Sequence, residues 1–424
     1  MINDNDSQNI KKEKLPPIWK RSKLIEVSII KGRIGWKGLT RSEFSNDGVL
    51  IVNGPDIKDG KVLWDKCLRI PRWRHEESAD ISVRKGDILV TKDGTIGKTA
   101  FIDDLPESAS IASGIFLIRT KNEEILNGKF LYQYFNSENF KELVESVIEG
   151  SVIPHLYQRD LEQLTIPLPP LNEQKAIVKI LSNLDSKIEL NQKMNKTLEA
   201  IAQAIFKHWF IDFEFPNEEG RPYKSSGGEM VDSELGEIPS KWKIGRLIDL
   251  TLNFDSKRVP LSSREREVRT GTYPYYGAAS LLDFVDSYIF DGIYLLVGED
   301  GTVIDEHGHP ILQYVFGRFW VNNHAHVIQG KYPFSTEYVY LLLKQLNVKH
   351  IVTGAVQAKI NQANLNSITV VMPPADLVNV FNRLIEGVFS KLRLNKNEMD
   401  SLTELREILL PKLISGKIRV PLEE

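Results

Sequence analysis

The chain carries an internal repeat, and this duplication limits its possible folds more than any other feature. Residues 16–26 contain a proline, a tryptophan, basic residues and a Leu-Ile-acidic run, and residues 239–249 repeat these types at matching spacing. Further matched pairs are Asp93-Gly94-Thr95 with Asp300-Gly301-Thr302, Gly150-Ser151-Val152 with Gly354-Ala355-Val356, and Ile166–Pro170 with Ile368–Pro374. A repeat of this length predicts two copies of one structural unit.

Each half is predicted to be a mixed α/β domain followed by one long helix. Short β-type runs are broken by Gly, Asp and Asn at 48–52, 87–91 and 114–118 in the first half, and at 292–297 and 325–329 in the second. Helices are predicted at 128–147 and 335–346. The domains have diverged much more than the long helices. This asymmetry indicates a shared scaffold that carries two different recognition surfaces.

The long helices have strong apolar periodicity. Apolar residues recur at three-and-four spacing, at Ile177, Leu181, Leu184, Ile188, Leu198, Ala202, Ile205 and Trp209 in the first helix, and at Phe381, Ile385, Val388, Leu392, Met399, Leu402, Leu409 and Leu413 in the second. Such a seam over several heptads predicts a coiled coil. The alternative is two amphipathic helices, each packed on its own domain. The matched seams favour packing of the helices on each other.

The expected fold is therefore α+β, with two mixed domains separated by an antiparallel two-helix coiled coil and related by pseudo-twofold symmetry. A segment rich in Gly, Glu, Ser and Pro lies between the halves and is interpreted as a linker that lets the chain turn back. Helices of roughly 36–40 residues would extend about 55–60 Å. The predicted divisions are a disordered tail 1–14, a first domain 15–168, a central helix 169–214, a linker 215–238, a second domain 239–372 and a C-terminal helix 373–424.

One polar residue interrupts each apolar seam. Asn191 lies between Ile188 and Leu198, and Asn395 lies at the matching place in the second helix. Antiparallel copies related by a twofold axis bring equivalent midpoints together, so we expect the two asparagines to lie near each other. A buried polar pair fixes register at some cost in stability.

Composition excludes several classes of protein. With 42% hydrophobic and 26% charged residues, and without a run of about 18 apolar residues, the chain is expected to be globular, without a membrane span. Its single cysteine, Cys67, cannot form an internal disulfide, which fits a reducing cytoplasm. The net charge of −3 counts mildly against a protein that wraps DNA alone. Any DNA contact must come from local basic clusters or from partner subunits.

Four segments of the chain resemble conserved regions of the type I restriction–modification specificity subunits (HsdS). They are Ile166-Pro-Leu-Pro-Pro-Leu-Asn-Glu-Gln174, Phe206-Lys-His-Trp-Phe-Ile-Asp-Phe-Glu214, Ser225-Ser-Gly-Gly-Glu-Met-Val-Asp-Ser-Glu-Leu-Gly236 and Leu409-Leu-Pro-Lys-Leu-Ile-Ser-Gly-Lys-Ile418. The second copy departs from the Pro-Pro-Leu-x-Glu-Gln pattern, because residues 373–378 read Pro-Pro-Ala-Asp-Leu-Val.

The resemblance implies a role in DNA recognition. Two target-recognition domains would each read half of a split, asymmetric site in double-stranded DNA. The paired helices would be a spacer and a docking platform for two modification subunits, which hold S-adenosylmethionine and methylate adenine. Restriction subunits would join through them. The specificity chain would have neither a catalytic residue nor a cofactor.

The sequence independently favours a chain without catalysis. Adenine methyltransferases hold the flipped base with an Asn/Asp-Pro-Pro-aromatic motif, and this tetrapeptide is absent from the sequence. The run Gly94–Thr99 looks like a phosphate-binding loop, but the required first glycine is Lys92, so a β-turn is favoured. His307, His309, His324 and His326 could suggest a metal site, but ordinary surface or base-contacting histidines are favoured and no metal is expected.

Two basic segments are the candidates for DNA contact. In the first domain they are Arg69, Arg72, Trp73 and Arg74, interpreted as a loop, with Lys92 and Lys98 flanking the turn at Gly94. In the second domain they are Lys257, Arg258, Arg264 and Arg266, followed by Tyr275 and Tyr276. Arginine binds guanine or phosphate bidentately, and interleaved basic and aromatic residues suit DNA grooves. The alternative for both segments is a solvated charged loop, neutralised by nearby acids or lying beside core tyrosines.

Two other functions are alternatives for a chain with this sequence. One is a methyltransferase, which the missing adenine-pocket motif disfavours. The other is a protein scaffold that mimics DNA, which would need strongly acidic recognition faces. The arginine-rich segments disfavour that second function.

Overall fold

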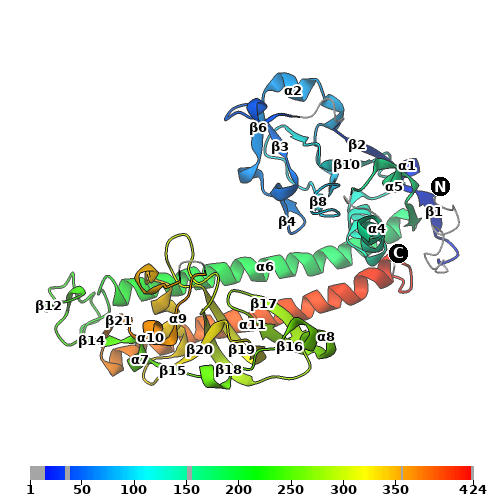
Figure 1. The fold of residues 1–424 in the computed structure, drawn as a ribbon. Coiled ribbons are helices and arrows are strands. Elements are labelled where there is room, and N and C mark those ends of the chain that lie inside the picture. The colour runs from blue at the N-terminus through cyan, green and yellow to red at the C-terminus, as the bar shows by residue number, and fades with distance from the viewer. Residues whose placement is uncertain (1–14, 34–38, 150–154, 355–356, 422–424) are drawn as a thin grey trace. The chain divides into compact units, whose positions relative to one another are not determined.

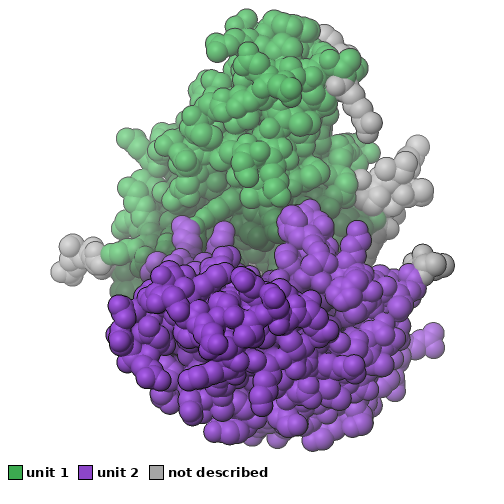
Figure 2. Space-filling view, turned by 90° about the vertical axis from the view of Figure 1, so that its left-hand side faces the viewer, with its two compact units in different colours: residues 1–189, 400–424 green, residues 190–399 purple. Residues whose placement is uncertain are grey.

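The computed structural model describes residues 15–33, 39–149, 155–354 and 357–421. The predicted tail 1–14 and the repeat residues 150–152 and 355–356 lie outside these ranges. The chain forms two compact units (Figure 1; green and purple in Figure 2). Unit 1 comprises residues 1–189 and 400–424, and unit 2 comprises residues 190–399. Both units mix helices and strands, as predicted.

Unit 1 is built around a four-stranded antiparallel sheet with strand order β2-β10-β7-β8. Its strands are β1 (Lys20–Lys23), β2 (Ser28–Gly32), β3 (Val49–Val52), β4 (Ile57–Lys58), β5 (Lys61–Val62), β6 (Leu68–Ile70), β7 (Ile88–Thr91), β8 (Thr99–Phe101), β9 (Ala109–Ile111), β10 (Ile115–Thr120) and β11 (Thr165–Leu168). Its helices are α1 (Leu24–Val27), α2 (Arg72–Glu76), α3 (Gly128–Phe135), α4 (Glu138–Glu149) and α5 (Gln158–Gln163), with 3-10 turns η3 (Arg41–Glu43), η4 (Gly54–Asp56), η5 (Trp64–Lys66) and η6 (Ala79–Ile81). A second sheet has the order β6-β3-β9.

Unit 2 is built around a six-stranded sheet with strand order β15-β20-β18-β19-β16-β17. Its strands are β12 (Met230–Ser233), β13 (Gly236–Pro239), β14 (Lys243–Arg246), β15 (Thr251–Asn253), β16 (Thr270–Tyr276), β17 (Leu281–Val285), β18 (Phe290–Gly298), β19 (Leu312–Val321), β20 (Ala325–Gly330) and β21 (Thr369–Met372). Its helices are α7 (Leu247–Leu250), α8 (Ser263–Val268), α9 (Thr336–Leu343) and α10 (Gln362–Asn366), with 3-10 turns η7 (Asp255–Lys257) and η8 (Lys349–Ile351).

The duplication extends to the topology of the two units. The order β2-β10-β7 in unit 1 matches β15-β20-β18 in unit 2, and the pair β1–β11 matches β14–β21. The hydrogen bonds match as well. The Lys92 amide donates to the Gly114 carbonyl oxygen at 2.9 Å, and the Glu299 amide donates to the His324 carbonyl oxygen at 2.8 Å. The units therefore share a core, and they differ in the strands added to it.

Two helices of 40 residues each, α6 (Leu171–Phe210) and α11 (Ala375–Ile414), contribute to both units. In unit 2, the Phe381 ring lies 4.8 Å from the Phe210 ring, and Asn395 hydrogen-bonds Asn195. In unit 1, Arg406 pairs with Asp185 at 2.6 Å. Along α6 from Asp185 through Asn195 to Phe210, the partner residue in α11 falls from Arg406 through Asn395 to Phe381, so the two helices run antiparallel. Both interpretations of the seam hold in part, because the helices contact each other and also pack into the domain cores.

A buried contact joins the start of each domain to the residues that follow a long helix. In unit 1, the Trp19 indole donates to the Glu173 carboxylate at 2.9 Å, and the Arg419 guanidinium donates to the same carboxylate at 2.9 Å. Glu173 is completely buried. In unit 2, the Trp242 ring stacks on the Phe215 ring with centroids 5.2 Å apart. Tryptophan occupies the matching position in both contacts.

The structure differs from the prediction in three segments. The helix predicted at 128–147 is divided into α3 and α4, because the Asn136 and Ser137 side chains bond the carbonyl oxygens of Tyr132 and Tyr134. The segment interpreted as a linker is folded. It contains the β12–β13 hairpin and a stack of Phe215 on Tyr223, with centroids 4.6 Å apart. The basic loop at 69–75 consists of strand β6 and helix α2. Among the described helices, none is long and apolar enough to cross a bilayer.

Candidate nucleic-acid interface

The basic segment of unit 1 exposes two of the four side chains expected to face DNA. Arg69 forms a bidentate pair with Glu107 at 2.6 and 2.7 Å, which lowers the pKa of that carboxyl. Arg74 is only 8% exposed and pairs with Glu43 and Glu77, both at 2.6 Å. By contrast, Arg72 and Trp73 are exposed on α2. The expectation that Arg74 faces a ligand is therefore wrong, because its charge is neutralised within the unit.

The turn between β7 and β8 exposes one of its two lysines to solvent. The Lys92 ammonium lies 4.9 Å from the centre of the Phe116 ring and is partly buried. The exposed Lys98 and Lys58, the last residue of β4, line one shallow hollow of about 290 Å³. Gly94 and Gly97 both have positive φ, which fits the favoured β-turn. Lys58 was not identified from the sequence, because an isolated lysine in a two-residue strand gives no distinguishing signal.

The basic segment of unit 2 is likewise divided between exposed side chains and side chains that are paired or buried within the unit. Lys257 and Arg264 are exposed. Arg266 pairs with Asp283 at 3.1 Å and lies 5.2 Å over the ring of Tyr275. Tyr275 is completely buried, and its hydroxyl accepts the Leu261 amide at 2.9 Å. Its expected role in DNA contact is therefore wrong, because the hydroxyl and the ring are both enclosed in the unit.

The remaining two candidate residues of unit 2, Arg258 and Tyr276, are also partly buried. Arg258 is largely buried and bonds Glu299 at 2.7 Å and the Ala325 carbonyl oxygen at 2.8 Å. Tyr276 is half-buried, with its ring 5.8 Å from the Phe319 ring. Arg258 was predicted to contact DNA, and in the structure it has a structural role.

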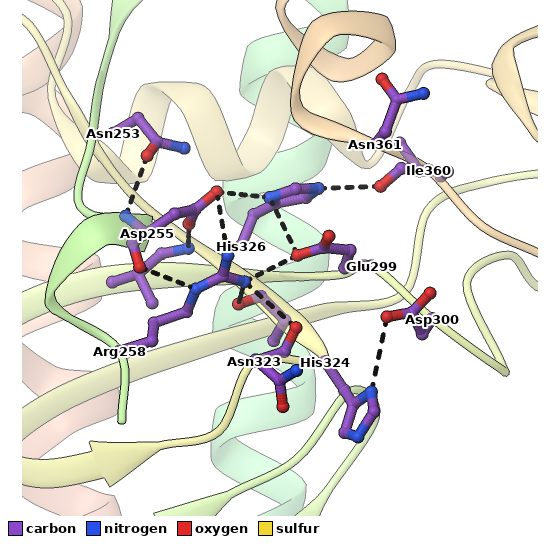
Figure 3. A network of polar contacts seen from close by, with 12 residues as sticks. Asn253, Asp255, Arg258, Glu299, Asp300, Asn323, His324, His326, Ile360 and Asn361 are labelled. Carbon is purple, nitrogen blue, oxygen red and sulfur yellow. Dashed lines mark hydrogen bonds and ion pairs between the residues drawn. The ribbon is translucent and has the colours of Figure 1, made fainter. Parts of the chain in front are cut away.

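One histidine expected at the surface lies in the core instead. His326 is completely buried, and its ring contacts Asp255 at 2.6 Å and the Ile360 carbonyl oxygen at 2.8 Å (Figure 3). Asp255, Glu299 and His326 place potential metal ligands within 4.8 Å of one another. Both ring nitrogens already face acceptors, and Arg258 occupies the space beside the carboxylates. This cluster therefore suits an internal ion network better than a metal ion.

Asn191 and Asn395 are completely buried in the helix pair of unit 2. The Asn191 amide donates to Glu398 at 2.8 Å, and the Asn395 amide donates to the Asn195 side-chain oxygen at 2.8 Å. The side-chain oxygens of Asn191 and Asn395 have no hydrogen-bond partner among the described residues. The two amides thus lie in a polar layer within the apolar seam.

The outer faces of the long helices carry apolar side chains that the sequence reasoning missed. Leu190 of α6 and Leu394 of α11 occupy matching positions and are 52% and 60% exposed. Ile201 and Leu405 also occupy matching positions and are 45% and 43% exposed. The inner seam dominated the apolar pattern, so this second set was not recognised. Its duplication on both helices is a signal that could have revealed it.

Comparisons with known proteins agree with this architecture. The chain is 27% identical over 352 residues to the type I restriction enzyme MjaIX specificity subunit of Methanocaldococcus jannaschii, covering 79% of this chain and 78% of that one. It is 23% identical over 450 residues to the type I restriction enzyme HindI specificity subunit of Haemophilus influenzae, covering 87% and 94%.

A solved structure has the same fold. The crystal structure of the type I restriction–modification system S subunit from M. genitalium superposes with a TM-score of 0.56 at 19% identity, covering 98% of both chains. A family model described as the type I restriction modification DNA specificity domain matches residues 18–200 and 239–398, one match in each half of the repeat. The chain therefore belongs to the type I restriction–modification DNA specificity family, and it is a specificity subunit rather than a catalytic one.

Proposed function

We propose that this chain reads a bipartite, asymmetric site in double-stranded DNA, with one half-site read by each unit. The observation that carries this proposal is the duplicated core with divergent additions. Unit 1 adds the sheet β6-β3-β9, whereas unit 2 extends its main sheet with β16 and β17. Two units of one plan with different outer strands suit a reader of two different sequences.

The exposed basic side chains, together with the exposed indole of Trp73, are the proposed DNA contacts. In unit 1 they are Arg72, Trp73 and Lys98, with the newly identified Lys58. In unit 2 they are Lys257 and Arg264. Arginine suits bidentate contact with guanine, and lysine suits phosphate. Since several other arginines are neutralised internally and the net charge is −3, we infer that partner subunits supply much of the phosphate contact.

We also propose that two modification subunits dock on the outer faces of α6 and α11. The matched exposed pairs Leu190 with Leu394 and Ile201 with Leu405 support this idea. Matching apolar positions on two helices offer the same surface twice, which suits two copies of one partner. Restriction subunits join through the modification subunits. The S-adenosylmethionine site belongs to the modification subunits, and the complex works in the cytoplasm.

The test is replacement of one recognition domain. Residues 17–165 are exchanged for the corresponding domain of a relative, and methylome sequencing follows in a strain that expresses the chain with its modification subunit. One half of the methylated site should change and the other half should remain. A change in both halves would contradict the assignment of one half-site to each unit. Methyl transfer by the purified chain alone would restore the methyltransferase hypothesis.

A further inference from the structure

The ring of His326 lies between two hydrogen-bond acceptors (Figure 3). Its Nε2 is 2.8 Å from the Ile360 carbonyl oxygen, which can only accept, so this nitrogen carries a proton. Its Nδ1 is 2.6 Å from one oxygen of Asp255. The other Asp255 oxygen accepts the Val327 amide at 2.8 Å. Although burial raises the pKa of this carboxyl, the bonds from His326 and Val327 lower it below its ordinary value, so Asp255 is ionised at neutral pH. Both ring nitrogens therefore act as donors, which only the charged imidazolium can do.

The carboxylates around His326 outnumber the arginine and lysine cations beside them. Three carboxylates converge there, from Asp255, Glu299 and Asp300. Arg258 lies 2.7 Å from Glu299, and Lys359 lies 3.2 Å from Asp300 and 3.4 Å from Glu299. A further titratable neighbour is His324, which is half-exposed and lies 3.4 Å from Asp300. An imidazolium at His326, 3.6 Å from Glu299, supplies the third internal cation.

The network joins three segments that are distant in the sequence. Asp255 belongs to η7 and Arg258 follows it, Glu299 and Asp300 form the turn after β18, and Ile360 precedes α10. Arg258 also donates to the Ala325 carbonyl oxygen at 2.8 Å, which fixes its segment against β20. The exposed Lys257, a proposed DNA contact, lies on the first of these segments.

Unit 1 has different chemistry at the matching positions. Lys92 corresponds to Glu299 and Phe116 corresponds to His326, and the Lys92 ammonium lies 4.9 Å from the Phe116 ring centre. Equivalent backbone bonds support this correspondence, because Leu156 donates to Lys92 at 3.1 Å and Ile360 donates to Glu299 at 2.9 Å. Unit 1 therefore has no imidazole at this position.

We propose that His326 is an imidazolium at neutral pH and that it positions the DNA-reading loops of unit 2. Raising the pH therefore weakens DNA binding by unit 2 but not DNA binding by unit 1. The loop-positioning part rests on the proposed function, whereas the protonation part does not. His326 is a positioning residue and not itself a contact to DNA.

The direction of the pH effect follows from the surroundings of the ring. Burial alone would lower the pKa of His326, but the hydrogen bond and charge of Asp255 and the Ile360 carbonyl oxygen raise it above the ordinary value. The stabilisation is therefore complete below about pH 6.5 and is lost as the pH rises through the raised pKa. Burial would raise the pKa of Asp255, but the bonds from His326 and Val327 lower it. The Asp255 contribution is lost only in acid.

The protonation state is measured by NMR of the full chain with isotope-labelled histidine. The sequence contains 8 histidines. One of them should remain charged at a pH where the exposed ones are neutral. That signal should vanish in the His326→Gln variant and persist in the matched control His324→Gln, which changes a half-exposed ring on the same segment. If His326→Gln fails to fold, single substitutions of the other histidines identify the signal by elimination. A neutral His326 ring at pH 7 overturns the proposal.

The positioning role is measured with the assembled methyltransferase. Raising the pH from 7 to 9 should weaken specific DNA binding at least fivefold more for the wild-type and His324→Gln complexes than for the His326→Gln complex. Equal pH dependence in all three overturns the positioning role. A charged His326 in a complex that binds no specific DNA sequence would instead count against the proposed function, so the two failures are distinguishable.

Discussion

The buried contacts around Trp19 in unit 1 and around Trp242 in unit 2 use opposite chemistry. In unit 1, the buried carboxylate of Glu173 accepts bonds from Trp19 and Arg419. In unit 2, the matching positions hold Leu377, Trp242 and Phe215, and the aromatic rings stack. The same backbone arrangement thus accommodates a polar contact around Trp19 and an apolar contact around Trp242, which we call the polar and the apolar closure. The comparison teaches that the shared core determines which positions are in contact. The side chains at those positions can differ between the two units.

The largest expected effect concerns the matching outer positions of the long helices. Leu394→Asp should remove one docked modification subunit, and Leu190→Asp should remove the other. Each substitution should cost about 2–4 kcal/mol of docking free energy, because a charge replaces an apolar anchor. Mass measurement of the assembled complex gives the number of subunits bound. Lys396→Asp, an exposed change on the same helix, is the control. Full occupancy in both leucine variants would remove this face from the docking surface.

The next effect concerns the polar closure around Trp19 and the apolar closure around Trp242. Glu173→Leu should destabilise unit 1 by about 1.5–3 kcal/mol, because the buried Trp19 donor and the Arg419 charge lose their acceptor. Adding Arg419→Phe copies the closure of unit 2 and should recover part of that loss. Urea denaturation, with hydrogen exchange to locate the change, measures both variants. If the losses of unfolding free energy from the two substitutions simply add in the double variant, the polar and apolar closures are not interchangeable.

A third effect separates exposed arginines from buried ones. Arg72→Ala should weaken recognition of the half-site read by unit 1, and Arg264→Ala should weaken the other. The cost is about 1–3 kcal/mol for a base contact, or a lower salt dependence for a phosphate contact. The matched control Arg74→Ala should mainly lower stability. Arg258→Ala also releases the segment that carries Lys257, so it should lower stability and weaken the half-site of unit 2 less than Arg264→Ala does. DNA titrations at several salt concentrations, paired with thermal unfolding, test this. Half-site effects confined to the buried pair would reverse our assignment.

The smallest effect concerns the polar layer of the helix pair. Replacing Asn191 and Asn395 with leucine should stabilise the pair by about 1 kcal/mol, because two buried oxygens without partners are removed. If the layer fixes register, the variant should also methylate sites whose half-sites are spaced differently. Thermal unfolding and methylome sequencing measure the two effects. A stabilised variant that keeps the original spacing would show that the layer does not set register.

The elements of the fold were largely predictable, because local patterns determine them. The strands expected at 48–52, 87–91 and 325–329 correspond to β3, β7 and β20, and the apolar seams of α6 and α11 are buried or half-buried. Alternating or three-and-four spacing of apolar residues is visible within a few residues of sequence. The family was recognisable for the same reason, since its motifs are short and continuous.

The contact residues were less predictable, because an arginine does not reveal its partner. Arg74 pairs with Glu43 and Arg258 pairs with Glu299, and each partner lies far along the chain. Tyr275 and Tyr276 are successive residues of strand β16, so their side chains point to opposite faces. Predicting that strand would have indicated that one tyrosine is buried. Only the three-dimensional arrangement shows which basic side chains remain exposed.

The division of the chain into units has a consequence for biosynthesis. Unit 2 is continuous in the sequence, whereas unit 1 needs residues 400–424, which follow all of unit 2. The ribosome adds about 5–20 residues per second, so the first part of unit 1 waits on the order of 10–50 s for its remaining helix. During that time Glu173 lacks Arg419, and the apolar side chains that pack on Leu413 and Ile414 lack their cover. The second half of the repeat is therefore expected to finish folding before the first.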